Sequence, residues 1–190
     1  MTTQPTPALP APAQTGGPAP LLLTLRLAEP AQSVFQALRL RHFPRERDQV
    51  PAHVSLFHTL PGSERAGITR RLHALGATQP DILVEPPRSL GRGVAFRLVS
   101  PELQAIRASL AEEWADWLTP QDRQPYQPHV TVQNKVTPDG ARATLVRLQQ
   151  GFVPWRTAGT ALLLWRYLGG PWEAIERIEL DPPEPGKQAD

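Results

Sequence analysis

The sequence contains no cysteine among its 190 residues. Without cysteine the chain forms no disulfide and has no thiolate chemistry, which fits a cytoplasmic protein. Long apolar runs are also missing, since the stretch LLLTLRL at residues 21–27 is far shorter than the ~18 residues of a membrane span. The residues before this stretch lack the basic start of a signal peptide. We therefore expect a cytoplasmic protein that does not cross a membrane.

Lysine is scarce, because Lys135 and Lys187 are the only two and the other 18 of the 20 basic residues are arginine. The net charge of +2 is too small to predict nucleic-acid binding from charge alone. The planar fork of arginine suits phosphate oxygens. A genome whose base composition favours arginine codons explains the same bias, so composition permits a phosphate ligand without requiring one.

Both ends of the chain are rich in proline. Residues 1–20 hold six prolines and almost no large apolar side chain. Such a segment buries too little apolar surface to offset the entropy lost on ordering, so we expect a disordered tail. The last residues, 181–190, predict a second flexible tail. The folded unit is expected at 21–180, long enough to bury a core as a single domain.

Strand-like and helix-like segments alternate within this unit. We expect strands at 21–27, 53–60, 81–89, 94–99, 129–136, 160–168 and 172–180. We expect helices at 31–41 and 63–75, from Pro101 through Trp117, and at 138–149. Ser100 followed by Pro101 marks a helix start, because serine caps the first turn and proline fits its first position. The order of elements repeats in the two halves, which predicts a duplicated α+β unit.

One short pattern occurs twice in the chain. The stretch PAHVSLFHTL begins at Pro51, and QPHVTVQNKV begins at Gln127. In each stretch a histidine is followed by an aliphatic residue, a hydroxyl residue and another aliphatic residue, and His53 and His129 lie 76 positions apart. One such copy is readily explained by chance. Two copies, each after a proline and before a helix, favour a functional pair.

Strand geometry turns each copy into a two-pronged polar surface. Side chains alternate between the faces of a strand, so His53 and Ser55 share one face, as do His129 and Thr131, about 7 Å apart along the strand. Imidazole accepts or donates a proton near neutral pH. The hydroxyls can donate hydrogen bonds to phosphate oxygens. No carboxylate lies in or next to either motif, so the pattern favours attack on a phosphodiester without a metal ion.

The tetrapeptides HVSL and HVTV resemble the paired H-x-[ST]-x signatures of the 2H phosphoesterase superfamily, in its bacterial 2′-5′ RNA ligase and cyclic phosphodiesterase branch. The resemblance covers the whole folded unit. It implies an α+β fold of two pseudo-symmetric lobes of antiparallel sheet, with helices packed outside, around a central cleft. It also implies catalysis without metal or cofactor, with His53 and His129 as the acid–base pair and Ser55 and Thr131 holding the phosphate.

The residues that follow each motif depart from the family pattern. Many members have an arginine after the second motif, where this chain reads QNK, and an FLG-like stretch after the first, where it reads FHTLPG. Strand alternation puts Lys135 on the His129 face, so Lys135 is a candidate for the missing positive charge. It also puts Phe57 and Gln133 on the histidine faces. His58 falls on the aliphatic face or beyond the end of the strand, and we expect a structural role for it.

Further residues are candidates for substrate binding, each with an ordinary alternative. Tyr126, in the loop before His129, either stacks on a base or packs on its lobe. Arg97 and Arg166, on expected strands, either reach phosphate or point outward. Trp165 either offers a stacking surface or packs in the core.

The resemblance implies an RNA-end phosphoesterase that opens 2′,3′-cyclic phosphates to 2′-phosphates, or joins or cleaves 2′-5′ linkages. We expect it to act as a monomer on RNA. One alternative keeps the chemistry but acts on a small cyclic nucleotide or 2′-5′ oligonucleotide. Another is a non-catalytic RNA-binding module, which would not require an imidazole in each half. Missing carboxylates disfavour a metal hydrolase, and the missing G-x-S-x-G elbow disfavours a serine hydrolase. The sequence does not show which histidine is the base.

Overall fold

The computed structural model describes residues 18–48 and 50–183. The strands are β1 Leu21–Leu27, β2 Val54–Leu60, β3 Asp81–Ser89, β4 Val94–Val99, β5 His129–Gln133, β6 Trp155–Tyr167 and β7 Trp172–Glu179. The helices are α1 Ala31–His42, α2 Arg65–His73, α3 Pro101–Glu113 and α4 Pro138–Gln149. Most of the two tails expected at 1–20 and 181–190 lies outside the described residues. None of the helices in the described part has the length and apolar character that a bilayer span requires.

The elements follow the predicted order, and two strands differ from their expected bounds by more than one residue. The helix expected through Trp117 ends at Glu113, and a separate 3-10 turn follows at Ala115–Trp117. β5 ends at Gln133 rather than at 136. β6 begins at Trp155 rather than at 160, because its first residues, 155–158, pair with β3. The predicted cap of α3 is present, since the hydroxyl oxygen of Ser100 accepts a hydrogen bond from the backbone N–H of Leu103 at 3.1 Å.

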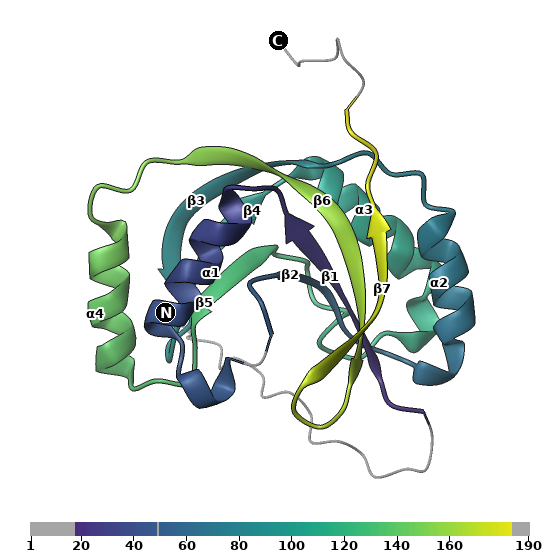
Figure 1. The fold of residues 1–190 in the computed structure, drawn as a ribbon, viewed down its shortest axis with the longest axis horizontal. Coiled ribbons are helices and arrows are strands. Elements are labelled where there is room, and N and C mark those ends of the chain that lie inside the picture. Colours follow the sequence, from purple (N-terminus) through teal and green to yellow (C-terminus); the bar gives the residue numbers. More distant parts are fainter. Residues whose placement is uncertain (1–17, 49, 184–190) are drawn as a thin grey trace.

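All strand pairs between these elements are antiparallel, and the order in the sheet is β1-β2-β5-β4-β3-β6-β7. β6 also pairs with β1, so the pairing closes into a ring. The ring has a pseudo-twofold relation between β2 and β5, because β2 is followed outward by β1 and then β6 in the same way that β5 is followed by β4 and then β3. Figure 1 shows α1 and α4 at one side of the sheet and α2 and α3 at the other. The predicted α+β class, with antiparallel strands and outer helices in two related halves, is confirmed.

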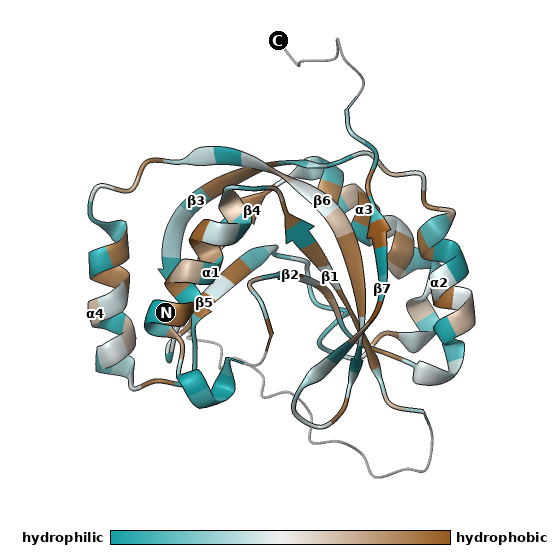
Figure 2. Cartoon of the chain, in the orientation of Figure 1, coloured by the Kyte–Doolittle hydropathy of each residue, from teal (hydrophilic) through white to brown (hydrophobic). Residues whose placement is uncertain are grey.

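The core lies between the sheet and these helices. All residues of β1 except Arg26 are buried, and the leucines at 21, 23, 25 and 27 belong to the core. Figure 2 shows the apolar stretches of β1 and β6 side by side. Phe35 of α1 lies at its centre, 5.3 Å from the ring of Phe96 and 5.7 Å from that of Trp155 between centroids. Trp114, just after α3, is only 2% exposed and packs on Phe57, as expected for a core aromatic.

Candidate active site

The two motif strands are neighbours at the centre of the sheet, where β2 pairs with β5 through Val54 and Val130. Both valines are fully buried, so the residues that flank them project from the opposite face. The register places four polar side chains there: His53 beside Thr131, and Ser55 beside His129. Such cross-strand neighbours have Cβ atoms about 5 Å apart. The structure therefore brings together the four motif side chains that the sequence singles out.

A bulge follows the hydroxyl residue of β2. Ser55 and Phe57 pair with successive residues of β1, so Leu56 is an extra residue. An extra residue reverses the alternation of side chains beyond it. Phe57 is therefore fully buried instead of lying beside His53. His58 lies on the face that holds His53, Ser55, His129 and Thr131, the candidate catalytic face, instead of on the aliphatic one. The sequence alternation does not reveal the bulge.

The second motif strand has the same irregularity at the same place. Thr131 and Gln133 pair with successive residues of β4, so Val132 is extra. Gln133 is buried as a result, and its Nε2 donates a hydrogen bond to the hydroxyl of Thr144 in α4 at 3.0 Å. Lys135 lies beyond the end of β5, exposed and in a left-handed conformation with φ of 59°. It is therefore not a strand residue on the His129 face.

A buried arginine holds each motif strand beside its bulge. Nη1 of Arg39, in α1, donates to the carbonyl of Thr131 at 2.9 Å, and its Nη2 contacts Oδ1 of Asp48 at 2.6 Å. Nε of Arg107, in α3, donates to the carbonyl of Leu56 at 2.7 Å. A carbonyl released from the ladder at a bulge needs such a partner when buried. Each half of the chain thus supplies the helix that fixes the catalytic strand of the other half.

Matching hydrogen bonds set the tautomers of the two histidines. Nδ1 of His53 lies 2.7 Å from the carbonyl of Pro51, and Nδ1 of His129 lies 2.8 Å from that of Gln127. A carbonyl only accepts, so Nδ1 carries the proton and Nε2 is left unprotonated and free of this contact. Burial lowers the pKa of His53 to about 4 and holds the pKa of His129 below its usual value, against the opposing effect of these bonds. Both rings are therefore neutral at neutral pH.

A third histidine, His58, lies on this face and is held by a buried carboxylate. Its Nδ1 lies 2.9 Å from Oδ1 of Asp122, whose side chain is 1% exposed. The backbone N–H groups of His58 and Thr59 also donate to Asp122. Although burial acts to raise it, these hydrogen bonds keep the pKa of Asp122 below its usual value. The carboxylate is ionised, so it fixes the ring of His58 with Nε2 free of this contact.

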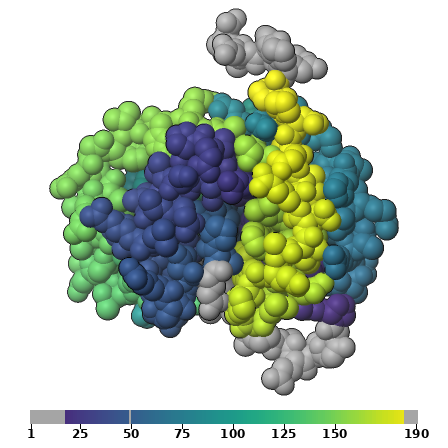
Figure 3. Space-filling model, viewed as in Figure 1, coloured from purple at the N-terminus to yellow at the C-terminus, as the bar shows by residue number. Residues whose placement is uncertain are grey.

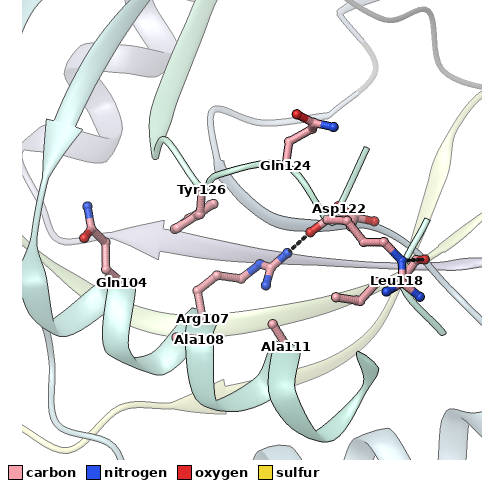
Figure 4. Close-up of a pocket in the computed structure, with 9 residues that line it drawn as sticks. Gln104, Arg107, Ala108, Ala111, Leu118, Asp122, Gln124 and Tyr126 are labelled. Atoms are coloured by element: carbon pink, nitrogen blue, oxygen red, sulfur yellow. Dashed lines mark hydrogen bonds between the residues drawn. The ribbon is translucent and has the colours of Figure 1, made fainter. Parts of the chain in front are cut away.

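Tyr126 lies in a pocket between α3 and the loop that follows it. The pocket is also lined by Gln104, Arg107 and Asp122 (Figure 4). The guanidinium carbon of Arg107 lies 5.6 Å from the centre of the Tyr126 ring, which packs against the hydrophobic core. Burial raises the pKa of the Tyr126 hydroxyl, which has no hydrogen-bond partner among the described residues. Of the two expectations for Tyr126, stacking on a base or packing on its lobe, the structure therefore shows packing.

The two predicted arginines take different positions. Arg97 pairs with His129 across β4 and β5, so it lies on the catalytic face, where its Nη1 contacts Oε2 of Glu85 at 3.0 Å. Arg166 alternates with Trp165 near the end of β6 and contacts Glu173 at 2.9 Å. Alternation puts Arg166 on the opposite face from Trp165, so it is not brought to the histidines.

Sequence reasoning missed Arg88 in β3. Arg88 pairs with Ala95, which pairs with Thr131, so the small alanine separates the arginine from the catalytic strand in one row of the sheet. Its Nη1 donates to Oε1 of Gln127 at 2.9 Å, and its Nε is buried without a hydrogen-bond partner among the described residues. Its charge acts on His129. Only the strand register identifies it, because a strand arginine ordinarily points outward.

These groups suit a single bound phosphate. Two imidazole Nε2 atoms, two hydroxyls and one arginine converge on one face of adjacent strands, where they can exchange protons with substrate and donate to phosphate oxygens. Across residues 18–48 and 50–183, no group of three or more histidine or carboxylate side chains is placed to hold a metal ion.

Comparison with known proteins agrees with this geometry. The sequence profile of the 2′-5′ RNA ligase superfamily matches residues 27–171. Escherichia coli LigT in complex with 3′-AMP has the same fold, with a TM-score of 0.57 and 16% identity over 86% of this chain and 99% of LigT. TT0787 of Thermus thermophilus has a TM-score of 0.54 and 18% sequence identity, over 86% of this chain and 98% of TT0787.

A structure described as a phosphoesterase gives a TM-score of 0.55 and 17% identity over 86% of this chain and 99% of that chain. No curated protein matched the sequence. At these identities the solved structures show a shared fold, whereas the profile match over most of the chain shows the family. The chain therefore belongs to the 2′-5′ RNA ligase superfamily.

Proposed function

We propose that this protein is a metal-independent phosphoesterase of RNA ends, which opens 2′,3′-cyclic phosphates to 2′-phosphates and joins or cleaves 2′-5′ linkages. The observation that carries the proposal is the pairing of Val54 with Val130, which sets both histidine–hydroxyl motifs on one face. The superfamily is one of phosphoesterases and ligases, and LigT was solved with a nucleotide, 3′-AMP. Both facts support a nucleotide phosphodiester as the substrate class.

The reaction uses the two Nε2 atoms as base and acid. One neutral imidazole removes a proton from water as the water oxygen bonds to phosphorus. The bond between phosphorus and the ribose 3′ oxygen breaks, and the other histidine, protonated in the substrate complex, gives that oxygen its proton. The product has a 2′-phosphate and a free 3′ hydroxyl. An RNA hydroxyl in place of water gives a new phosphodiester by the same transfers.

Ser55, Thr131 and Arg88 bind the charge that builds on the phosphate. The two hydroxyls lie beside the imidazoles, so each can donate to a non-bridging oxygen. Arg88 adds a positive charge. Among the described residues, its side-chain hydrogen-bond partner is the neutral amide of Gln127, so no carboxylate there neutralises this charge. A phosphate that binds there also favours the protonated form of one histidine, which burial alone disfavours.

The test is turnover of an RNA oligonucleotide with a 2′,3′-cyclic phosphate, measured in excess chelator. We expect wild-type turnover to a 2′-phosphate, and a loss of about 100-fold or more in both His53→Ala and His129→Ala, because each removes a proton-transfer group. His73→Ala is the matched control, since His73 is a 55% exposed histidine of α2. Loss of wild-type turnover in chelator, or full turnover in either variant, would contradict the proposal. RNA binding without turnover would indicate a binding module.

A further inference from the structure

An aromatic pair borders the catalytic face on the His53 side. The ring of Trp172, the first residue of β7, lies 5.1 Å from the imidazole of His53 between centroids, at an interplanar angle of 49°. Trp165 lies behind it at 6.1 Å. Nε1 of Trp165 donates to the hydroxyl of Thr24 at 2.8 Å, and Thr24 is fully buried beside Ser55 in β1. Trp165 is thus a fixed support for the partly exposed ring of Trp172.

Strand pairing alone would not bring Trp172 to His53. Trp172 pairs with Tyr167, whereas the row of the sheet that contains His53 meets β6 near Ala161. Six residues of strand span about 20 Å. The rings nevertheless touch, so the end of the β6–β7 hairpin folds over the catalytic face. Figure 3 shows β7, in yellow, beside the purple and blue part of the chain.

The two sides of the catalytic face therefore differ in chemistry. The β2 side has the indole of Trp172, and the β4 side has the guanidinium groups of Arg88 and Arg97. The two motifs between them are nearly symmetric, so they do not orient a substrate. An aromatic ring on one side and positive charge on the other can orient a substrate, because nucleobases stack on aromatic rings and phosphates bind arginine.

We propose that Trp172 is the stacking surface for the nucleobase of the nucleotide that carries the reacting phosphate. This inference rests on the proposed function and narrows it to substrates with a base, held with the base over β2 and the phosphate between the motifs. Stacking on one indole accepts any base, because every base has a π-face. The site therefore requires a base without selecting a sequence through Trp172.

The test compares two RNA oligonucleotides with a terminal 2′,3′-cyclic phosphate, one complete and one whose last sugar lacks its base. The measured quantity is kcat/KM of the complete oligonucleotide divided by kcat/KM of the abasic one. Loss of the indole also exposes His53, but this changes the turnover of both substrates alike and cancels in the ratio. We expect Trp172→Ala to reduce this ratio about ten-fold, chiefly through KM of the complete substrate. Trp172→Phe should restore most of it. Leu168→Ala, on the 55% exposed tip of the same hairpin, should leave it unchanged.

A binding measurement tests the inference without turnover. Titration with a nucleoside 2′-phosphate should quench the fluorescence of the wild type more than that of Trp172→Phe, and ribose 5-phosphate should quench neither. If the wild type turned over neither oligonucleotide, the proposed function would fail, and the titration would still decide the role of Trp172. An unchanged ratio in Trp172→Ala, or equal quenching in wild type and Trp172→Phe, would overturn the inference.

Discussion

The chemistry of this protein depends on how single nitrogen atoms are presented. In both motifs the carbonyl two residues before the histidine accepts from Nδ1, at 2.7 Å for His53 and 2.8 Å for His129. The same local bond therefore selects the same tautomer twice and leaves Nε2 of each ring unprotonated. Burial then keeps both rings neutral in the free protein. In the proposed reaction, the charge of a bound phosphate favours protonation of one of them.

This burial predicts how stability depends on pH. The pKa of His53 is about 4 in the folded chain and near 6.5 when unfolded, so between these values the unfolded state binds more protons. Stability is therefore present above pH 6.5 and is lost as the pH falls toward 4. The pKa of His129 is lowered too and adds in the same direction.

Urea denaturation between pH 4.5 and 7.5 checks this expectation. The free energy of unfolding of the wild type should fall toward acid pH, and the decline should be shallower in His53→Gln. His73→Gln is the control, because that side chain is 55% exposed. Equal slopes in wild type and His53→Gln would show that the imidazole of His53 is not desolvated by the fold.

At the level of elements, the bulges and their arginines are what position the motifs. Each motif strand has its extra residue directly after the hydroxyl, and each displaced stretch is held by an arginine from a helix of the other half. Arg39 and Arg107 are 4% and 5% exposed. Arg39 holds a backbone carbonyl and the carboxylate of Asp48 together, and Arg107 holds the backbone carbonyls of Leu56 and Asp122. A single point charge such as lysine cannot replace either guanidinium.

Arg39→Met tests this support. The substitution leaves Asp48 as an unpaired carboxylate with a 9% exposed side chain and removes the bond to the carbonyl of Thr131, so we expect a loss of about 3 kcal/mol of stability. Arg41→Met, at an exposed position of the same helix, should change stability by less than about 0.5 kcal/mol. Urea denaturation measures both, and equal stability of the two variants would contradict a supporting role for Arg39.

The sequence predicted most strands and helices correctly, but it did not predict the bulges in the motif strands or the early start of β6. Apolar alternation and the Ser100–Pro101 cap are local signals, and the corresponding strands and α3 occur where they predict. A bulge depends on the partner strand, so alternation misplaced Phe57, His58 and Gln133. The first residues of β6 were missed because their place in the sheet is defined by pairing with β3, far away in sequence.

At the scale of the whole molecule, duplication explains why two short motifs meet. The pseudo-twofold relation places β2 beside β5, and the antiparallel register then sets each histidine next to the hydroxyl of the other motif. Repetition in the sequence predicted the two halves, whereas the exchange of supporting helices between them had no sequence signal. Arg88 and Trp172 also had none, because strand pairing and a folded hairpin bring them to the face from outside the motifs.

The most direct test of the central claim is a crystal structure of the protein with a nucleoside 2′-phosphate bound. We predict one phosphate group with the Nε2 atoms of His53 and His129 each within about 3 Å of its oxygens, and the hydroxyls of Ser55 and Thr131 in contact with it. A phosphate that contacts only one of the two imidazoles, or that binds away from both motif strands, would contradict the account.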